Sequence, residues 1–223
     1  MSDLYIVATP IGNLQDITFR ALDILKSVDC ILSEDTRVTK KLLENFEISS
    51  KLLPFHQHSD FRQFEKVKDL LEKGKNLALV SDAGTPGISD PGGKLVEYIA
   101  GNCPSVKIVP IPGASASVAA LSISGFPADK FVFMGFPPHK KGREKFFKEL
   151  AEAKYTVVFY ESRYRILKTL EALKEIRGKI VVCRELTKMF ESIYRGSAEE
   201  ISGQLKKDKI KGEFVVVVGK KLN

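Results

Sequence analysis

The chain has 223 residues, of which 43% are hydrophobic and 28% are charged, an ordinary composition for a soluble globular protein. This length suffices for one large domain or for two domains of about 100 residues each. The longest uncharged run, residues 108–128, contains three prolines and four serines and is a poor membrane span. Because no targeting pattern precedes the first apolar segment, we expect a cytoplasmic protein without a membrane anchor.

The formal net charge of +7 is unevenly distributed. Residues 1–128 contain 13 Lys and Arg against 15 Asp and Glu, whereas residues 129–223 contain 22 against 13. The second half therefore carries a net charge of +9, which favours a polyanionic partner there. A lysine-rich solvated surface would give the same count.

The three cysteines, Cys30, Cys103 and Cys183, are far apart and show no CxxC spacing. This pattern indicates reduced thiols and argues against a disulfide framework or a zinc site. Apolar runs surround Cys30 and Cys183, so both are predicted to be buried.

Short apolar runs alternate with helical patterns along the first half. Asp16 offers an N-cap to a helix that extends to Val28, and Gly74 ends a later helix. The predicted strands are 4–8, 30–32, 76–80 and 106–109, and the other predicted helices lie near 39–46, 61–71 and 94–100.

The same alternation continues in the second half. Ser162 can cap a helix that carries Ile166 and Leu173, and Ser197 begins a capping box with Glu200. A small-residue helix is predicted at 114–124, and strands are predicted at 131–134, 156–160, 180–183 and 214–218.

Strand–helix alternation predicts an α/β fold with mostly parallel sheets whose strands are covered on both faces. The segment Pro110-Ile-Pro112-Gly113 interrupts the pattern shortly before the charge balance shifts, so we place a domain boundary there. The two predicted α/β domains are residues 1–111 and 112–223. Clefts between domains are common ligand sites.

Common nucleotide and hydrolase fingerprints are missing, since the chain contains no GxGxxG after its first strand, no GxxxxGK[ST] and no GxSxG. His56 and His58 could share a metal ion, but no acidic or histidine cluster accompanies them, which favours a polar loop. What remains are three Gly/Pro loops at predicted strand ends, 9–13, 81–93 and 112–116. Because ligands of α/β sheets lie beyond the carboxyl ends of the strands, these loops form one plausible site.

Charged clusters also follow predicted strands, at 33–37, 161–163 and 184–188. Each could be explained by helix capping and surface ion pairs, yet their arginines also suit phosphate recognition. Residues 139–145 (HKKGREK) are predicted to form a basic loop that could follow a nucleic-acid backbone.

Five segments resemble the tetrapyrrole methylase superfamily, and above all its branch that acts on small-subunit ribosomal RNA. They are 4–14 (LYIVATPIGNL), 33–37 (SEDTR), 81–92 (SDAGTPGISDPG), 112–116 (PGASA) and 125–138, within a resemblance from about Leu4 to Gly219. The resemblance implies two α/β domains with S-adenosylmethionine in the cleft between them, usually in a homodimer. It also implies methylation of a cytidine ribose 2′-hydroxyl at the decoding centre of 16S ribosomal RNA, on free RNA or on the 30S subunit.

The resemblance further implies a set of cofactor-binding positions. Most relatives carry an acidic residue where this chain has Thr85, so a hydroxyl or backbone hydrogen bond would replace a charge contact there, and Glu161 matches a methionine of many relatives. The matched positions are Ile11, Gly12, Ala83, Gly84, Thr85, Ile88, Ser115, Ala116, Glu161 and Leu186.

A sulfonium already activates its methyl group, so the reaction needs no metal, only alignment and exclusion of water. A ribose hydroxyl is a weak nucleophile, which calls for a nearby base or cation. The candidate bases are Glu185, Asp35 and Glu161, and the candidate electrostatic partners are Arg37, Arg184 and Lys188.

Two alternatives fit the same residues: methylation of a corrin or porphyrin precursor, and a non-catalytic RNA-binding assembly factor with the same fold. The superfamily branch also includes members that continue past the last strand into a small helical module, whereas this sequence stops at Asn223.

Overall fold

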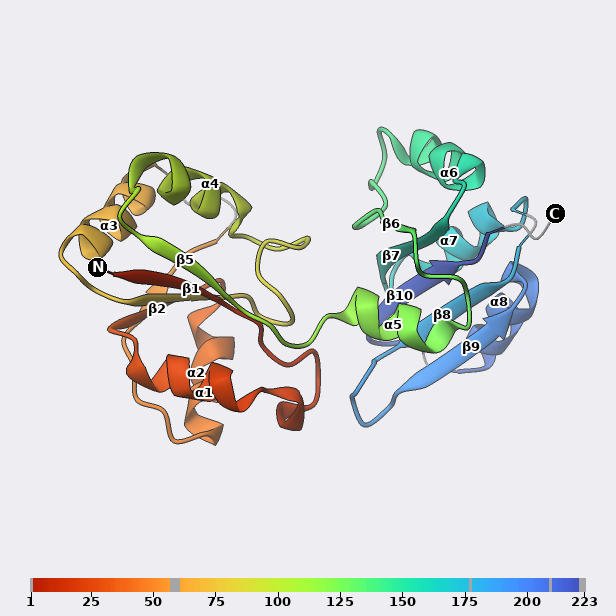
Figure 1. The fold of residues 1–223 in the computed structure, drawn as a ribbon. Helices are drawn as coiled ribbons and strands as arrows, with labels where there is room; N and C mark the ends of the chain where they lie inside the picture. The colour runs from red at the N-terminus through yellow and green to blue at the C-terminus, as the bar shows by residue number, and fades with distance from the viewer. Residues whose placement is uncertain (1, 57–60, 177, 209, 221–223) are drawn as a thin grey trace. The chain divides into compact units, whose positions relative to one another are not determined.

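The computed structural model describes residues 2–56, 61–176, 178–208 and 210–220. The chain forms two compact units, Met1–Ser115 and Ala116–Asn223 (Figure 1). The division follows the loop 112–115 because this loop is held by the first unit, where the Thr85 hydroxyl donates to the Ala114 carbonyl at 3.2 Å.

The first unit is a five-stranded parallel sheet in the order β3-β2-β4-β1-β5. Its strands are β1 (Asp3–Val7), β2 (Cys30–Ser33), β3 (Leu52–Pro54), β4 (Leu77–Val80) and β5 (Lys107–Ile111). Its helices are η1 (Leu14–Asp16), α1 (Phe19–Ser27), α2 (Thr36–Asn45), α3 (Phe61–Glu72) and α4 (Gly93–Asn102).

Helices cover both faces of this sheet, with α3 and α4 on one side and α1 and α2 on the other (Figure 1). Successive strand residues point to opposite faces, so Leu79 packs in the α3–α4 core while Ala78 and Val80 pack in the α1–α2 core. The expectation of parallel strands is confirmed for this unit, and burial on both faces is confirmed for the central strands β2 and β4, whose residues are all buried.

The second unit is a five-stranded sheet in the order β6-β7-β10-β8-β9. Its strands are β6 (Phe131–Phe133), β7 (Thr156–Ser162), β8 (Ile180–Arg184), β9 (Ser192–Gly196) and β10 (Glu213–Val218). Its helices are α5 (Ala116–Ser124), α6 (Arg143–Glu152), α7 (Ile166–Leu173) and α8 (Ala198–Lys207).

The prediction of mostly parallel sheets is wrong for this second sheet. Only β6 and β7 pair in parallel, whereas β10 runs antiparallel to both β7 and β8, and β8 and β9 are antiparallel. Helices α6, α7 and α8 contribute to the core on one face, and α5 contacts β7 and β10. In the sequence, strands that are buried on both faces are continuous apolar runs. Such runs do not indicate whether neighbouring strands are parallel or antiparallel.

Three local predictions also need correction. Thr18 rather than Asp16 is the N-cap of α1, since its side chain accepts from the Ala21 N–H at 3.1 Å. Ser162 is the last residue of β7 and does not cap α7. Residues 143–145 of the predicted basic loop form the first turn of α6, whose Phe146 and Leu150 enter the core.

Other sequence expectations are confirmed. Ser197 and Glu200 form the predicted capping box of α8, and Gly74 (φ +79°) follows α3 with its N–H bonded to the Leu71 carbonyl. All three cysteines are buried free thiols. Within the described residues, no helix is both long and apolar enough to cross a membrane.

Candidate active site

The loops after β1 and β4 are joined at the carboxyl edge of the first sheet. The Thr9 N–H donates to the Gly84 carbonyl at 2.9 Å, and the Gly84 N–H donates to the Thr9 carbonyl at 3.1 Å. The Thr9 hydroxyl also donates to the Ser81 carbonyl at 3.1 Å. These bonds fix two of the three predicted Gly/Pro loops against each other at adjacent strand ends, where α/β sheets present their ligand sites.

The loop after β5 completes this group. A Cβ added to Gly84 (φ +83°) would lie 3.5 Å from Ile11 and 3.7 Å from the Ala114 carbonyl oxygen. A Cβ added to Gly113 would lie 2.9 Å from the Ala8 Cβ and 3.5 Å from the Ala8 carbonyl oxygen. The structure thus brings the three loops together, and glycine permits their close approach.

The variant Gly113→Ala is therefore expected to lose roughly 1–2 kcal/mol of unfolding free energy through overpacking against Ala8. Thermal and urea unfolding measure the loss. Gly101→Ala is the matched control, because nothing lies within 4 Å of the added Cβ in α4 and alanine favours a helix. Equal stability of Gly113→Ala and wild type would show that the loop contact is loose.

The predicted cofactor residues of the first unit lie in these loops. Gly84 is buried, Thr85 and Ile11 are half-buried, and Gly12 and Ala83 are exposed. Ile88 is an apolar side chain that is 47% exposed. The Thr85 hydroxyl is occupied by the Ala114 carbonyl, so it holds the loops together rather than standing free for a ligand.

Asp35 and Arg37, two predicted catalytic residues, form a closed pair at the start of α2. The Arg37 Nη2 lies 2.6 Å from Asp35 Oδ2, and Arg37 Nε and the Arg37 backbone N–H donate to the same carboxylate. These hydrogen bonds lower the pKa of Asp35 to about 2. A carboxylate with so low a pKa accepts protons poorly, so the pair provides fixed charge rather than a base.

Three other carboxyl groups at the same edge, those of Glu34, Asp82 and Asp90, have raised pKa values. None of them was among the site residues predicted from the sequence. Burial is the first cause for each, followed for Asp90 by the charges of Glu34 and Asp82. The pKa of Asp90 is raised to about 6. The only available signal was the place of Asp90 in the loop 81–93, because burial and neighbouring charge are properties of the fold.

In the second unit, Glu185 and Lys188 lie together after β8. The Lys188 ammonium is 3.0 Å from Glu185 Oε1 and 2.7 Å from Glu213 Oε2. Burial raises the pKa of Glu185, but hydrogen bonds from the Glu213 N–H and from Lys188 outweigh it and leave that pKa below its usual value. Glu185 (φ +51°) therefore joins the ends of β8 and β10.

Glu161 is part of a buried ionic cluster, which we call the Glu161 cluster: Glu161, Arg143, Arg165 and Thr169. The carboxylate is fully buried and lies 2.9 Å from Arg165 Nη2 and 3.9 Å from Arg143 Nη1. It also accepts from the Thr169 hydroxyl at 2.5 Å and from the Ser162 N–H at 2.7 Å. Both oxygens are thus occupied within the unit, so a ligand would meet the backbone of Glu161 rather than its carboxylate.

The remaining predicted positions lie at element ends. Ser115 precedes α5, Ala116 is its first residue, and both are half-buried. Leu186, 8% exposed, follows β8 next to Glu185. Arg184 is the last residue of β8, and its Nε donates to the Lys211 carbonyl at 2.8 Å.

No metal centre is evident in the part of the chain that the structure describes, where no group of three or more His, Cys, Asp and Glu could hold an ion. His56 makes an interaction with a neighbour, and His58 lies outside the described residues.

Comparison with known proteins places this geometry in a family. The model of the family "Tetrapyrrole (Corrin/Porphyrin) Methylases" matches residues 3–202, which include the three joined loops and the Glu161 cluster. This chain belongs to the tetrapyrrole methylase family.

Curated relatives of this family member are named ribosomal RNA small subunit methyltransferase I. The protein of Halalkalibacterium halodurans is 46% identical over 96% of this chain and 75% of its own length. The protein of Bacillus subtilis is 46% identical over 98% of this chain and 75% of its own length. That of Thermotoga maritima is 44% identical over 99% of this chain and 100% of its own length. The chain therefore belongs to this branch of the family.

Solved structures show the same fold at low identity. A cobalt precorrin-4 methyltransferase of cobalamin biosynthesis has a TM-score of 0.69 at 19% identity, covering 97% of this chain and 94% of its own. Diphthine synthase has a TM-score of 0.71 at 16% identity, and the match covers 100% of this chain and 92% of the synthase chain. The predicted α/β tetrapyrrole methylase fold is confirmed.

Proposed function

We propose that this protein transfers a methyl group from S-adenosylmethionine to the ribose 2′-hydroxyl of a cytidine in small-subunit (16S) ribosomal RNA. Relatives at 44–46% identity that carry the name of a small-subunit rRNA methyltransferase support the RNA substrate. The basic second half, with its net charge of +9, is suited to a polyanion. Such a protein would act in the cytoplasm, where ribosomes are assembled.

The observation that carries the proposal is the joining of the three loops at the carboxyl edge of the first sheet. Gly12 and Ala83 are small, exposed residues of these loops, and Ile88 offers an exposed apolar side chain. This combination fits a nucleoside with a polar amino-acid tail, since backbone groups can bind polar edges while Ile88 covers an apolar face. Bound S-adenosylmethionine supplies a methyl group that its sulfonium has already activated.

The protein's part in the reaction is to position the ribose hydroxyl and take its proton. We propose Asp90 as the proton acceptor, because its carboxyl is half-buried in the cofactor loop and its pKa of about 6 lies nearest to neutral pH. Arg37, oriented by its ion pair with Asp35, is the proposed electrostatic partner and hydrogen-bond donor at the same edge. Lys188, oriented by Glu185 and Glu213, is the corresponding donor in the second unit.

We propose that the remaining predicted positions also contribute to cofactor binding. Ile11, Gly12, Thr85 and Ser115 would shape the binding loops, and Ala116, Leu186 and the Glu161 backbone would contribute from the second unit. A homodimer stays a prediction, and light scattering of the purified protein tests it.

The direct test combines labelled S-adenosylmethionine with small ribosomal subunits from a strain that lacks this protein, followed by nuclease mapping. We expect label on a single cytidine ribose, with naked rRNA tested in parallel. Label on a corrin or porphyrin precursor instead would establish the first alternative. Binding of cofactor and RNA without any methyl transfer would point to an assembly factor.

A further inference from the structure

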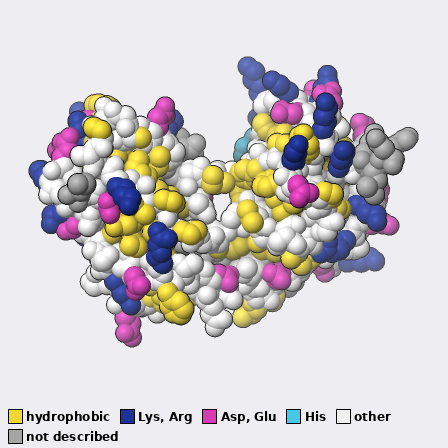
Figure 2. Space-filling view, in the orientation of Figure 1, with side chains coloured by type: hydrophobic (Ala, Val, Ile, Leu, Met, Phe, Trp, Pro, Cys, Tyr) yellow, Lys and Arg dark blue, Asp and Glu magenta, His cyan; other side chains and the backbone are white. Residues whose placement is uncertain are grey.

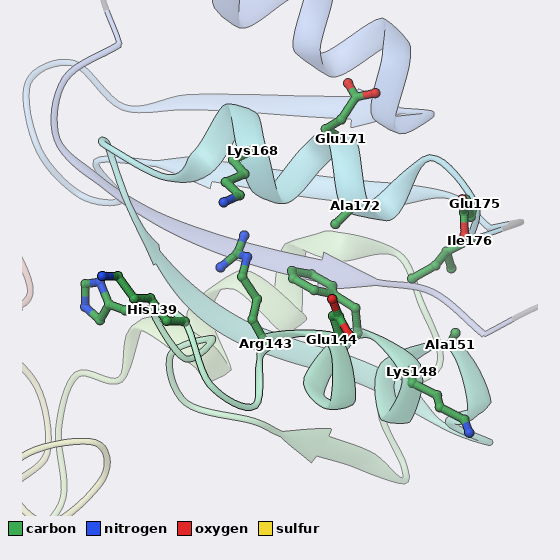
Figure 3. Close-up of a pocket in the computed structure, with 12 residues that line it drawn as sticks. His139, Arg143, Glu144, Lys148, Ala151, Lys168, Glu171, Ala172, Glu175 and Ile176 are labelled. Carbon is green, nitrogen blue, oxygen red and sulfur yellow. The ribbon is translucent and has the colours of Figure 1, made fainter.

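A groove between α6 and α7 lies entirely within the second unit (Figure 3). Its volume is about 770 Å³, which is ample for an extended polar segment. Of its lining residues, only Arg143 belongs to the Glu161 cluster, and none has a role in the proposed methyl transfer. The groove is thus a separate feature whose occupant can be inferred from its own side chains.

Cations converge at one end of this groove. The Arg143 guanidinium and the Lys168 ammonium point toward each other across it, with His139 beside them (Figure 3). Lys168 is exposed and takes part in none of the ion pairs found among the described residues. Like charges that face each other repel, and an anion between them would relieve this repulsion.

Acidic side chains also line the groove, but they do not cancel this charge. The Glu171 carboxylate points away from Lys168 (Figure 3) and is paired with Lys174 at 2.7 Å. Glu175 lies at the opposite end, next to Ile176, and Glu144 lies next to Arg143 (Figure 3). Four cationic side chains, Lys140, Arg143, Lys148 and Lys168, line the groove against these three carboxylates, so the groove keeps an excess of positive charge.

Arg143 is held rigidly and is incompletely neutralised. Its Nη2 donates to the Thr169 hydroxyl at 2.8 Å, and its Cζ lies 4.9 Å from the centre of the Phe147 ring. Arg143 is only 9% exposed, yet its Nη1 has no hydrogen-bond partner and lies 3.9 Å from Glu161. Because Glu161 also neutralises Arg165 at 2.9 Å, one carboxylate is shared by two guanidinium groups.

The surroundings favour a nucleic-acid backbone over a single small anion. Lys140 and Lys148 extend the positive charge along the groove, and Phe147 and Ile176 provide apolar surface for a sugar or base. Lys and Arg side chains also project from the surface around α6 (Figure 2). A row of cations beside apolar surface matches the regular phosphates and flat bases of RNA.

We propose that the α6–α7 groove binds backbone phosphates of the substrate RNA, with Arg143 and Lys168 around one phosphate and Lys140 beside the next. This inference rests on the proposed function, which names RNA as the substrate. The groove residues are separate from those proposed for methyl transfer, so the groove acts on RNA affinity rather than on the chemical step.

The experiment compares wild type with the double variant Lys140→Gln/Lys168→Gln, since both lysines are exposed and their loss leaves the core intact. Fluorescence anisotropy measures the affinity for a fragment of small-subunit rRNA over a range of salt concentrations. The double variant is expected to bind about tenfold more weakly, with a salt dependence of log Kd shallower by roughly 1.5, for two lost phosphate contacts. Its melting temperature and its affinity for S-adenosylmethionine should equal those of wild type.

The matched control is Lys145→Gln/Lys206→Gln, which removes the same charge at two exposed positions outside the groove. Near-wild-type affinity of this control supports the inference, and an equal loss in both double variants overturns it in favour of general charge attraction. Inorganic phosphate is added in a thermal unfolding arm. If phosphate stabilises wild type while the groove variant binds RNA like wild type, the groove is a site for a free anion and the proposal fails.

The same measurements separate this inference from the proposed function. A wild-type protein that methylates rRNA, together with a groove variant of unchanged affinity and salt dependence, would overturn the inference alone. A wild-type protein without affinity for RNA would overturn both.

Discussion

Replacing Glu161 with glutamine is expected to lower the unfolding free energy by about 3–5 kcal/mol, because it leaves two buried guanidinium groups without their carboxylate. The Glu161 side chain is fully buried, and those of Arg143 and Arg165 are 11% and 15% exposed. Screening by water is therefore small, and the uncompensated charges would have to be hydrated by local opening. Urea unfolding of the whole chain measures the loss.

A matched control is Glu171→Gln in the same unit. Glu171 is 66% exposed and pairs with Lys174 at 2.7 Å, so its loss should cost less than about 1 kcal/mol. The double variant Glu161→Gln/Arg165→Gln should recover part of the stability lost in Glu161→Gln, since it removes one of the stranded charges. If Glu161→Gln and Glu171→Gln prove equally mild, the cluster does not stabilise the unit.

The Glu161 cluster also shows where sequence reasoning reaches its limit. Glu161 was identified as a position of interest from a strand-end pattern, but its partner Arg143 was placed in a basic loop. Only the fold reveals that Arg143 begins a helix and turns its guanidinium inward. A buried ion pair between residues 18 positions apart leaves no periodic signal, because each charge alone looks like a surface residue.

Strand positions and the three Gly/Pro loops at strand ends were predictable for the opposite reason. Apolar runs such as Leu77–Val80 must be buried, and the glycines and prolines that follow them must turn the chain. Strand direction in the second sheet was not predictable, since Phe214–Val218 would look the same in a parallel or an antiparallel pairing.

The acid–base character of the carboxyl groups was likewise beyond the sequence. Asp35 and Asp90 both follow strands in the first unit, yet Arg37 lowers the pKa of one to about 2 while burial raises that of the other to about 6. The difference comes from contacts made on folding. The base that we propose is therefore Asp90, which was not among the candidates Glu185, Asp35 and Glu161 chosen from the sequence.

Asp90→Asn is accordingly expected to lower kcat by about 100-fold or more, the usual contribution of a general base. The amide keeps the size of the side chain and can still accept a hydrogen bond, so affinity for S-adenosylmethionine should be unchanged. In wild type, kcat should rise with pH through about 6 as the Asp90 carboxyl loses its proton. This rise should disappear in the variant, whereas Asp69→Asn, an exposed change on α3, should keep it.

The same substitution should raise stability, and this opposite sign distinguishes a catalytic role from a structural one. Between the ordinary pKa of 3.8 and the folded value of about 6, the folded protein retains a proton that the unfolded chain releases. The ionised carboxylate thus destabilises the fold above about pH 6, by about 1 kcal/mol after allowance for partial exposure. Asp90→Asn should be more stable than wild type at pH 8 and equal to it near pH 4.

Glu34→Gln provides an independent check on the Asp90 assignment. The negative charge of Glu34 is the second cause of the raised Asp90 pKa, so its removal should move the rise of kcat to lower pH while leaving the plateau in place. A variant Asp90→Asn that turns over at the wild-type rate would exclude Asp90 as the base, whatever its effect on stability. The Asp90 assignment predicts three results together. Asp90→Asn loses activity and gains stability at pH 8, and Glu34→Gln shifts the pH profile of kcat. Only a half-buried Asp90 carboxyl that takes the proton explains all three.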